Sequence, residues 1–566
     1  MQEKLCDLTR ATALPAAGTP QGTPLPCRGG AGVGSVIIIT LLLLSALSVS
    51  AGEIVVGEGE SIHEALRQAR EWRRTGDPRC QDGITIRLQA GRYYMSEPLF
   101  LRPEDSGTAA SPTIIAGQGD AVICGDAPRQ HRQLWPAEGM LRITGFDPAT
   151  RTITIPTPPR QTLQQLQALI APGQPDAASR PLLEMVVHQR WAIAILRVRE
   201  IRLEGRQCIV SFMDPESRLE FDHPWPQPVI GGERGNSSFL LRTTEQRHGV
   251  EQLVVVDGAS HIHFERLCFE NTCWNRPLLR GHVTLQGGFP LVDAYKLTQQ
   301  EGLPWDDTLE NQAWVERPVS AVSVGNAEHV TFRDCHFRRL AATALDFQPP
   351  TRACTVEAST FDHIGGTAIL AGSFAESPRE VHRPYADLAA QCRELSIVGN
   401  TISDAACEDW GAVGIGCGYV KDCTIRGNTV SGVNYSGICV GWGWTAQYTG
   451  MERNRIVGNS VSDYARQLYD AGGIYTLSNQ PGSLISANYI AQPHPAPYAT
   501  NHRAFCIYLD ARTDGFTIEH NRTADAPADA PTDAPRVVGG SPANTRLIRR
   551  DEIGDNHPGP HLIIKQ

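Results

Sequence analysis

Gly399-Asn400-Thr401-Ile402-Ser403 returns as Gly427-Asn428-Thr429-Val430-Ser431 and again as Gly458-Asn459-Ser460-Val461-Ser462. Weaker copies follow at Ala487-Asn488 and His520-Asn521, so the anchoring asparagines lie 28, 31, 29 and 33 residues apart. Repeats of this length are typical of a solenoid, in which each unit buries its apolar face only by stacking on its neighbours. The second half of the chain is therefore expected to form a repetitive stack.

The segments between the asparagines are short and alternate between apolar and polar residues. Examples are Leu395-Ser-Ile397, Cys423-Thr-Ile425 and Gly437-Ile438-Cys-Val440. This period of two indicates strands, and glycine and asparagine mark the bends between them. The pattern predicts an all-β fold, a right-handed parallel β-helix, with Asn400, Asn428 and Asn459 stacked at one bend. Asparagine also tolerates the left-handed backbone conformation that such a bend needs.

The rest of the chain divides around this solenoid. Residues 62–73 have helical spacing after Ser61, and Glu64 completes the pattern of a capping box, so a helix is expected to cap the open end. Residues 125–250 lack the repeat and predict an inserted β-rich subdomain. The Asp-Ala-Pro repeats after Thr523 read as an extended, mobile tail. The expected divisions are 1–51 (leader and signal peptide), 52–124 (cap and first rungs), 125–250 (insertion), 251–522 (β-helix) and 523–566 (tail).

The composition excludes several functions. The formal net charge is −10 without a basic cluster, so nucleic acid is not an expected partner. Among the 15 cysteines the spacing is irregular, which favours buried thiols over a disulfide scaffold. The sequence lacks P-loop, HExxH and GxSxG motifs, and it predicts no metal site and no cofactor. The oligomeric state stays open.

An apolar run of residues 36–51 ends in Val49-Ser50-Ala51. It is short for a membrane span and ends in the small residues of a signal-peptidase site. We expect cleavage near Ala51 and export to the periplasm or the outside, with no stable membrane partner. A retained N-terminal anchor is the alternative.

Several longer motifs carry a family resemblance. They are EMVVHQRWAIAILRV (184–198), GHVTLQGGFPLVDAYKL (281–297), LENQAWVERP (309–318), EDWGAVGIGCGYV (408–420), YSGICVGWGW (435–444), YDAGGIYTLSNQPGSLISANYI (469–490) and FCIYLDARTDG (505–515). Together they resemble glycoside hydrolase family 141, over most of residues 53–521. The resemblance implies activity like that of an α-L-fucosidase acting on complex pectin, or of a xylanase. It also places the catalytic carboxylates in the segments of Asp470 and Asp510.

The strand register gives independent support for acids on one face. The residues expected to point inward on equivalent strands are Leu345, Ile369, Ile415, Ile438, Ile474 and Ile507, although Ile369 and Ile438 differ from the others in their distance to the next anchoring residue. Residues at odd offsets from them then point outward. Asp346, Tyr475 and Tyr508 at +1 and Asp510 at +3 then share the outer face. Asp470 and Asp409 lie where a strand is reached from a bend, and Gly472-Gly473 is expected to bend Asp470 toward Asp510. Glycoside hydrolysis needs two carboxyl groups flanking the bond, and Asp470 with Asp510 is the preferred pair.

Further polar and aromatic residues are candidates for substrate binding. Flat indole rings separated by glycine, as in Gly441-Trp-Gly-Trp444, can stack on sugars. The predicted substrate-binding residues are Asp346, Asp409, Trp410, Trp442, Trp444, Tyr475, His502 and Tyr508. The sequence therefore predicts an exported glycoside hydrolase acting on a polysaccharide or oligosaccharide. A β-helix polysaccharide lyase or epimerase and a non-catalytic glycan-binding protein remain the alternatives.

Overall fold

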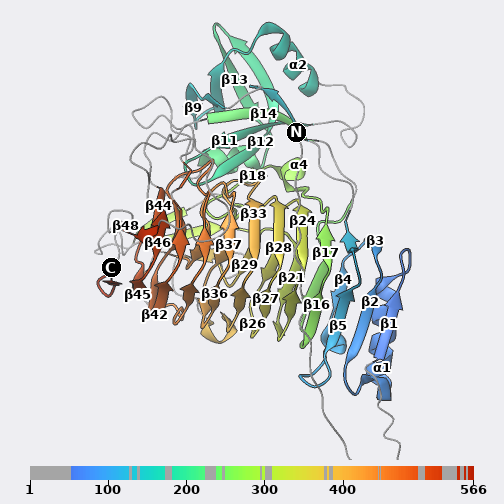
Figure 1. Cartoon of the computed structure of the whole chain (residues 1–566). Helices are drawn as coiled ribbons and strands as arrows, with labels where there is room; N and C mark the ends of the chain where they lie inside the picture. Colours follow the sequence, from blue (N-terminus) through green and yellow to red (C-terminus); the bar gives the residue numbers. More distant parts are fainter. Residues whose placement is uncertain are drawn as a thin grey trace, which may run out of the picture. The chain divides into compact units, whose positions relative to one another are not determined.

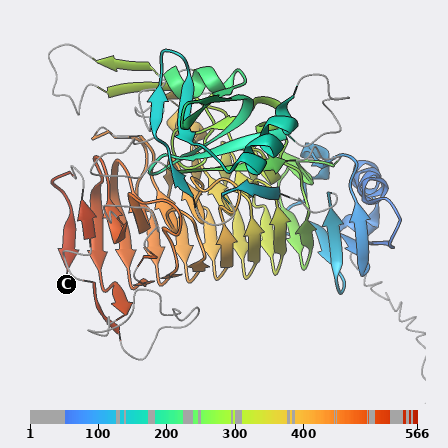
Figure 2. The ribbon, with the colours of Figure 1, turned by 90° about the horizontal axis from the view of Figure 1, so that it is seen from above.

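The computed structural model describes a parallel β-helix that carries an antiparallel subdomain on one side (Figures 1 and 2). It describes residues 52–125, 131–136, 140–171, 182–222, 238–244, 249–293, 296–299, 309–374, 379–381, 387–443, 445–446, 448–491, 493–494, 504–524, 545–548, 553–555 and 559–565. Within them, no helix is both long and apolar enough to cross a membrane. The right-handed parallel β-helix predicted from the repeat is confirmed.

Three long sheets, which we call A, B and C, form the solenoid, and one strand from each makes up a rung. Sheet A is parallel throughout. Its order is β1 (Gly52–Val56), β2 (Ile84–Leu88), β5 (Thr113–Gly117), β16 (Ile262–Glu265), β23 (Thr331–Arg333), β27 (Thr355–Glu357), β32 (Ser396–Val398), β36 (Thr424–Arg426), β39 (Arg455–Val457), β42 (Asn479–Ser486), β45 (Asp514–Glu519) and β49 (Ile563–Lys565).

Sheet B follows sheet A along the chain. Its order is β3 (Gly91–Tyr94), β6 (Ala121–Cys124), β17 (Cys268–Glu270), β24 (His336–Leu340), β28 (Thr360–Ile364), β33 (Thr401–Ala405), β37 (Thr429–Ser431), β40 (Ser460–Val461), β43 (Tyr489–Ile490), β46 (Arg522–Ala524) and β47 (Thr545–Leu547). All its pairs are parallel except the last, β46 with β47.

Sheet C closes each rung and lies beneath the subdomain. Its order is β4 (Leu99–Leu101), β15 (Val254–Asp257), β21 (Ser320–Gly325), β25 (Thr343–Phe347), β29 (Ile369–Ala371), β34 (Ile415–Cys417), β38 (Ile438–Val440), β41 (Ala471–Thr476), β44 (Ala504–Leu509) and β48 (Ile553–Asp555). A short sheet between C and A contains β22 (Ala327–Glu328), β26 (Thr351–Arg352), β31 (Cys392–Arg393) and β35 (Val420–Lys421).

The repeated asparagines form the predicted ladder at the bend between sheets A and B. The Asn400 side chain donates from Nδ2 to Asn428 Oδ1 at 3.0 Å, and the same bond continues through Asn459 and Asn488 to Asn521. Each Oδ1 also accepts the backbone N–H of the preceding asparagine, as in Asn400 N to Asn428 Oδ1 at 2.9 Å. Because the side chains are buried, these bonds satisfy polar groups that water cannot reach.

The left-handed residue at this bend is not the asparagine, as expected from the sequence, but the residue before it. Gly399, Gly427 and Gly458 all have φ of 66°, and Ala487 and His520 take the same region. Glycine suits this position because it lacks a Cβ. The asparagine is selected for its amide, which turns inward to the ladder.

The inward register predicted for sheet C is correct, including at Ile369 and Ile438, whose offsets differ. Strand pairing aligns Leu345, Ile369, Ile415, Ile438, Ile474 and Ile507 in one row. All of them are fully buried in the main core. Truncating such a residue to alanine costs about 2–5 kcal/mol.

The helix α1 (Ile62–Thr75) covers the first rung, as predicted. Ser61 caps it by accepting the Glu64 N–H, while the Glu64 carboxylate pairs with Arg67 rather than returning to the cap. Its apolar face, including Leu66 and Trp72, packs into the solenoid core. Two 3-10 turns follow in this region, η1 (Pro78–Cys80) and η2 (Pro103–Asp105), and η4 (Leu388–Ala390) lies farther along.

The opposite end differs from the expected mobile tail. Strands β48 and β49 pair in parallel with β44 and β45, and so extend sheets C and A beyond Asn521. The Asp-Ala-Pro repeats themselves lie outside the described residues.

Within the described residues the cysteines form no disulfide with one another, and most are buried. Two cysteines of the rungs lie outside the main core. Cys439 lies in the outward row of sheet C, and Cys268 packs with Val122 and Cys124 in a small cluster outside the main core.

The subdomain is an antiparallel sheet with its own hydrophobic core. Its path is β7 (His131–Trp135), β14 (Ser238–Thr244), β11 (Leu182–His188), β12 (Ile193–Glu204), β13 (Gln207–Phe212), β10 (Thr152–Pro156) and β9 (Gly145–Asp147), joined by β8 (Leu141–Arg142) and β18 (His282–Val283). The helices α2 (Arg160–Ile170), α3 (Glu216–Asp222) and α4 (Arg276–Arg280) accompany it, and β19 (Lys296–Gln299), β20 (Leu309–Trp314) and β30 (Arg379–Val381) form a separate small sheet.

The core of this subdomain includes residues of the solenoid. Leu370, Phe374, Tyr419 and Trp442 from the rungs pack with Phe289 and the strands of the subdomain. The subdomain is therefore docked by shared apolar packing onto the outer side of sheet C. The boundaries proposed for it from the sequence stay a prediction.

Candidate active site

A single register row runs along the outer face of sheet C. Strand pairing aligns Asp346, Leu370, Gly416, Cys439, Tyr475 and Tyr508 in that order. Neighbouring strands of a sheet lie about 4.8 Å apart. Asp346 is therefore about four rungs, or about 20 Å, from Tyr475 along the axis, while Tyr475 and Tyr508 are adjacent.

The two aspartates predicted to be catalytic meet at the adjacent tyrosines. The Tyr508 hydroxyl on β44 donates to Asp470 Oδ1 at 3.0 Å, and the Tyr475 hydroxyl on β41 donates to Asp510 Oδ2. The two phenol rings pack edge to face, with centroids 5.4 Å apart. Each tyrosine thus holds the aspartate of the other rung, and both carboxylates are partly exposed.

The bend that directs Asp470 falls at Asp470 itself, with φ of 62°. Gly472 and Gly473, expected to supply it, belong to the regular strand β41. Their small size serves packing instead, because a Cβ on Gly472 would lie 3.0 Å from Tyr508 Cβ. Left-handed backbone at a non-glycine residue costs free energy and is concentrated at functional sites.

A third tyrosine lies under the pair. The Tyr435 hydroxyl donates to the backbone oxygen of Asp470 at 3.0 Å. Burial, and then the negative charge of Asp470, raises the pKa of Tyr435 well above its ordinary value. Burial and the charge of Asp510 raise the pKa of Tyr475 in the same way. Both phenols stay protonated near neutral pH and remain donors.

The subdomain segment between β18 and Leu291 touches this cluster. Gln286 donates from Nε2 to the Tyr475 hydroxyl at 3.2 Å. Nearby, the ring of His188 stacks on Tyr469 with centroids 6.1 Å apart. Sequence reasoning missed Gln286 and Tyr435. Both residues lie in motifs that carry the family resemblance, 435–444 and 281–297, but Gln286 shares no repeat with the rungs it touches.

Asp346 and Asp409 lie in ion pairs, away from the tyrosine cluster. Asp346 is fully buried and accepts from Arg317 Nη2 at 2.5 Å and from Gln348 Nε2 at 2.8 Å. Asp409 is 5% exposed and its Oδ2 lies 2.8 Å from His282 Nε2. Neither carboxylate is placed to act with Asp470 or Asp510.

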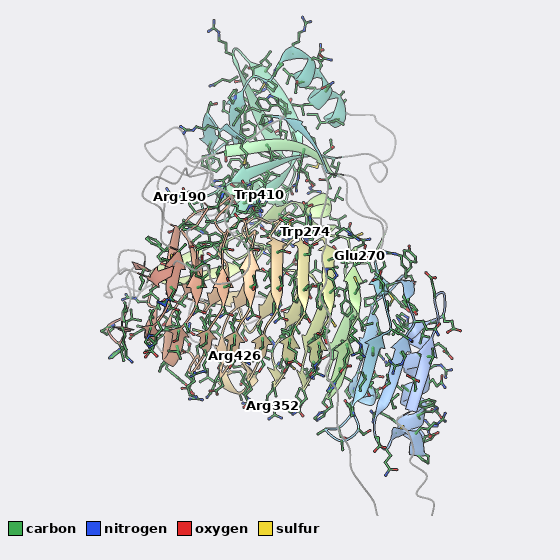
Figure 3. The ribbon with its side chains drawn as sticks, viewed as in Figure 1. Arg190, Glu270, Trp274, Arg352, Trp410 and Arg426 are labelled. Atoms are coloured by element: carbon green, nitrogen blue, oxygen red, sulfur yellow. The ribbon has the colours of Figure 1, made fainter. Side chains whose placement is uncertain are left out.

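The predicted tryptophans have different surroundings. Trp442 is 5% exposed and packs against Phe289 and Phe374, which are the contacts of a packing residue. Trp410 is partly exposed where the subdomain meets the rungs, and its Nε1 donates to Cys407 O at 3.3 Å (Figure 3). Trp444 and His502 lie outside the described residues.

The cluster supplies acid–base groups rather than a metal site. Over the described part of the chain, no group of three or more His, Cys, Asp and Glu side chains is placed to hold a metal ion. Two carboxylates held by phenols can donate and accept protons at a bound substrate. The arrangement suits the two-acid chemistry of glycosidic bond cleavage.

Comparisons with known proteins found a family model and solved structures that are similar to this chain. Residues 126–249 match the family model for the GH141 insertion domain. A solved structure described as a glycoside hydrolase is 29% identical, with a TM-score of 0.78, over 91% of this chain and 96% of that chain. None of the curated proteins matched this sequence.

More distant solved structures are similar to this chain as well. A DFA-IIIase from Arthrobacter chlorophenolicus A6 in complex with GF2 is 10% identical over 91% of this chain and 95% of its own, with a TM-score of 0.38. A GH136 lacto-N-biosidase from Eubacterium ramulus is 8% identical over 91% and 68%, with a TM-score of 0.34. At these scores they carry no argument about function.

Proposed function

From the premise that this chain is a glycoside hydrolase family 141-like protein with a parallel β-helix, we propose that Asp470 and Asp510 are its catalytic pair. The observation that carries the proposal is the crossed pairing of Tyr475 with Asp510 and Tyr508 with Asp470 on adjacent rungs. In glycoside hydrolysis one carboxylic acid protonates the leaving oxygen, and the other acts as nucleophile or as base for water.

The tyrosines orient these two carboxylates, because each phenol donates a hydrogen bond to one of them. Tyr475 remains a donor near neutral pH, because burial and the charge of Asp510 raise its pKa. The acid is identified by its variant, which should keep more activity on aryl glycosides with a good leaving group, because such a group departs without protonation.

We propose substrates of the pectin or xylan type, with α-L-fucosidase-like or xylanase-like action. The test is a screen of the purified chain from residue 52 onward against aryl α-L-fucoside, aryl β-xyloside, fucosylated pectic oligosaccharides and xylo-oligosaccharides. Release of reducing sugar that is absent from Asp470→Asn and Asp510→Asn supports the proposal. Equal activity in wild type and both variants contradicts it.

The lyase or epimerase alternative gives different products. Elimination produces an unsaturated uronide, which absorbs in the ultraviolet, and hydrolysis does not. Activity abolished by EDTA and restored by Ca²⁺ would also favour that alternative. A glycan-binding protein without catalysis would bind the same oligosaccharides and leave them intact.

We also propose that the chain is exported after cleavage near Ala51. The support is the apolar run with small residues at its end. N-terminal sequencing of the protein from the periplasm or medium of an expressing cell checks it. A mature protein that keeps residues 36–51 in the membrane fraction would show an anchor instead.

A further inference from the structure

A pocket lies at the bend that precedes the strands of sheet C, and Asp470 lies at the same bend farther along the solenoid. It is formed by residues 341–343 before β25, residues 365–367 before β29, and Asp409 with Ala412 before β34. Asp470 occupies the corresponding bend before β41. Only β38 separates β34 from β41 in sheet C, so the near side of the pocket is about 10 Å from the Asp470 rung.

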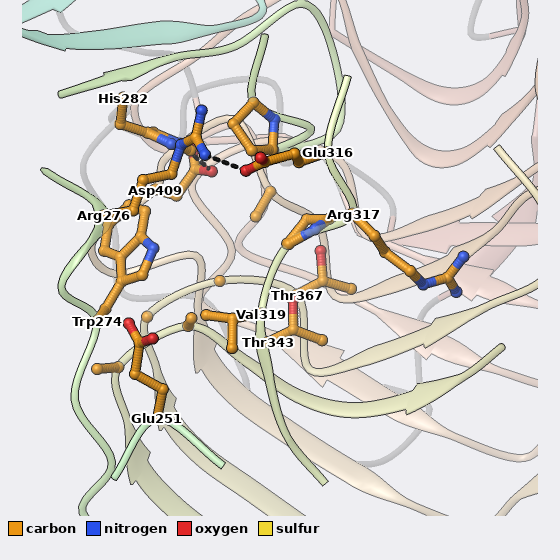
Figure 4. A pocket seen from close by; sticks show the side chains of 18 of the residues that line it. Glu251, Trp274, Arg276, His282, Glu316, Arg317, Val319, Thr343, Thr367 and Asp409 are labelled. Atoms are coloured by element: carbon orange, nitrogen blue, oxygen red, sulfur yellow. Dashed lines mark hydrogen bonds and ion pairs between the residues drawn. The ribbon is translucent and has the colours of Figure 1, made fainter. Parts of the chain in front are cut away.

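The subdomain closes this pocket with α4 and the segment after it (Figure 4). The side chains of Trp274, Arg276, Arg280, His282 and Glu316 line it. Its volume is about 150 Å³, and it opens to solvent. Small residues, among them Gly287 and Gly288, keep it open.

One segment joins this pocket to the tyrosine cluster. His282 lines the pocket, and four residues later Gln286 donates to the Tyr475 hydroxyl, which donates to Asp510. Gly287 also lines a second, more apolar cavity together with Tyr435 and Tyr475. A sugar chain with one residue in the pocket would therefore extend past Gln286 and Gly287 toward the tyrosine cluster.

The charges of the pocket are balanced. Its guanidinium groups belong to Arg276, Arg280 and Arg317, and its carboxylates to Glu251, Glu316 and Asp409. Glu316 accepts from both Arg276 and Arg280, the latter at 2.8 Å, and Arg317 is held by the buried Asp346. A sugar that carries a carboxylate would be repelled by the three carboxylates of the pocket. The guanidinium groups of the pocket could not offset this, because they are already paired with Glu316 or Asp346.

Two buried atoms in the wall have unused hydrogen-bonding capacity. His282 is 2% exposed and its Nδ1 has no partner, and Nε of the partly buried Arg276 also has none. Burial lowers the pKa of Arg276 to about 10, so its guanidinium stays charged near neutral pH. The pocket thus offers donors and acceptors together, which matches the hydroxyl groups of a sugar.

We infer that this pocket is a subsite for an uncharged sugar residue of the chain that is cleaved at Asp470 and Asp510. The inference rests on the proposed function and adds that the substrate is extended along the solenoid axis and neutral at this position. Recognition of a second sugar unit supplies binding energy remote from the reacting bond. Short aryl glycosides, which cannot reach the pocket, gain nothing from it.

The test uses an array of immobilised oligosaccharides probed with Asp470→Asn, which retains the pocket. The array carries neutral xylo-, arabinoxylo- and xyloglucan oligosaccharides and, as charged counterparts, oligogalacturonides and glucuronoxylan fragments. We expect binding to neutral members and at least a tenfold loss of affinity when Arg280→Ala or Glu316→Gln is added. Arg280 is exposed, so its removal leaves the fold intact.

The matched control is the exposed pair Arg202–Glu204 on the subdomain hairpin, 2.7 Å apart, changed to Arg202→Ala and Glu204→Gln. These variants are expected to bind like the parent. Binding to none of the glycans, binding to acidic glycans alone, or full affinity in Arg280→Ala and Glu316→Gln overturns the inference.

The array also separates this inference from the proposed function. If wild type hydrolyses glycosides but the pocket variants bind and act normally, the subsite is wrong and the proposed function stands. If neutral glycans bind through Arg280 and Glu316 but wild type cleaves nothing, the subsite stands and the proposed function fails. With a cleaved substrate, we expect the pocket variants to raise KM more for long chains than for short aryl glycosides.

Discussion

The bend between sheets A and B and the outer face of sheet C belong to the same rungs but use their residues differently. At the bend, Asn400, Asn428 and Asn459 repeat one residue and satisfy one another with amide bonds. On the outer face, equivalent positions carry Asp346, Leu370, Gly416, Cys439, Tyr475 and Tyr508. A residue type that recurs at equivalent positions indicates a role in the fold of every rung. Residue types that differ between equivalent positions indicate roles confined to individual rungs.

The largest effect is expected on the varied face. Asp470→Asn and Asp510→Asn should each lower kcat by about 10² to 10⁴ because one acid–base group is lost. Asparagine also tolerates the left-handed backbone at position 470. Unfolding midpoints should stay near wild type, since both carboxylates are partly exposed. Measurements of kcat and thermal melts check this. A variant with a lower unfolding midpoint and an unchanged kcat would contradict the view that the outer face serves catalysis and the bend serves stability.

The repeated bend should give the reverse result. Asn428→Ala removes a buried amide that accepts from Asn400 and donates to Asn459 Oδ1 and Ile397 O. Leaving those groups unsatisfied should cost about 3 kcal/mol or more in the free energy of unfolding.

Asn428→Ser is its matched control, because Ser359 fills the equivalent position two repeats earlier and its hydroxyl accepts the Cys335 N–H at 3.1 Å. We expect it to lose less stability than alanine. Urea unfolding measures both, with turnover per folded molecule as the second readout. An unstable Asn428→Ala with wild-type kcat supports the comparison, and a stable one with reduced kcat breaks it.

A buried carboxylate outside the candidate active site provides a further test of this comparison. Glu270 on sheet B is 1% exposed (Figure 3). Burial alone would raise its pKa, but hydrogen bonds from Arg339, Arg92 and Arg338 lower the pKa of Glu270 from 4.5 to about 2. Unlike Asp470, this acid should matter for stability: Glu270→Gln should lower the free energy of unfolding by about 3 kcal/mol at pH 7.

The pH dependence of that loss follows from the lowered pKa. The stabilisation by the charged Glu270 is complete above about pH 4.5 and is lost as the pH falls through about 2. Wild type and Glu270→Gln should therefore converge in stability as the pH approaches 2. Unfolding curves from pH 7 to pH 2 check this, and a constant difference would show that the effect is packing and not charge.

The smallest effect is expected from the phenols. Tyr508→Phe removes the hydroxyl that donates to Asp470 and keeps the ring packing. Loss of one such bond should cost about 1–2 kcal/mol in kcat/KM, or about tenfold. Turnover of a cleaved substrate checks this, and a Tyr508→Phe variant with wild-type kcat/KM would contradict the pairing.

The spacing of Asn400, Asn428 and Asn459 was enough to predict the solenoid and the ladder, because both depend on residues that recur at one position. The inward row of sheet C followed from the same logic. The left-handed conformation was predicted for the asparagine, but the residue before it adopts that conformation. The sequence shows that a bend contains glycine and asparagine, but it does not show which of the two is left-handed.

The candidate site was predictable in part. Tyr475 and Tyr508 were expected on one face with Asp510, and the pairing of β41 with β44 aligns the two tyrosines in one row. Their crossed bonds depend on side-chain directions that a strand pattern does not fix. The surroundings of Asp346 and Asp409 were not predictable, because their partners Arg317 and His282 come from segments outside the repeat.

The free thiols inside the rungs affect how the protein can be handled. Burial raises the pKa of Cys335, Cys354 and Cys417 to about 12, so these three side chains hold almost no thiolate at neutral pH and resist air oxidation. Unfolding exposes the same sulfurs at their ordinary reactivity, and mispaired disulfides would then block the return of the rungs. Melting in air should therefore be irreversible and depend on scan rate, whereas a reductant should restore refolding.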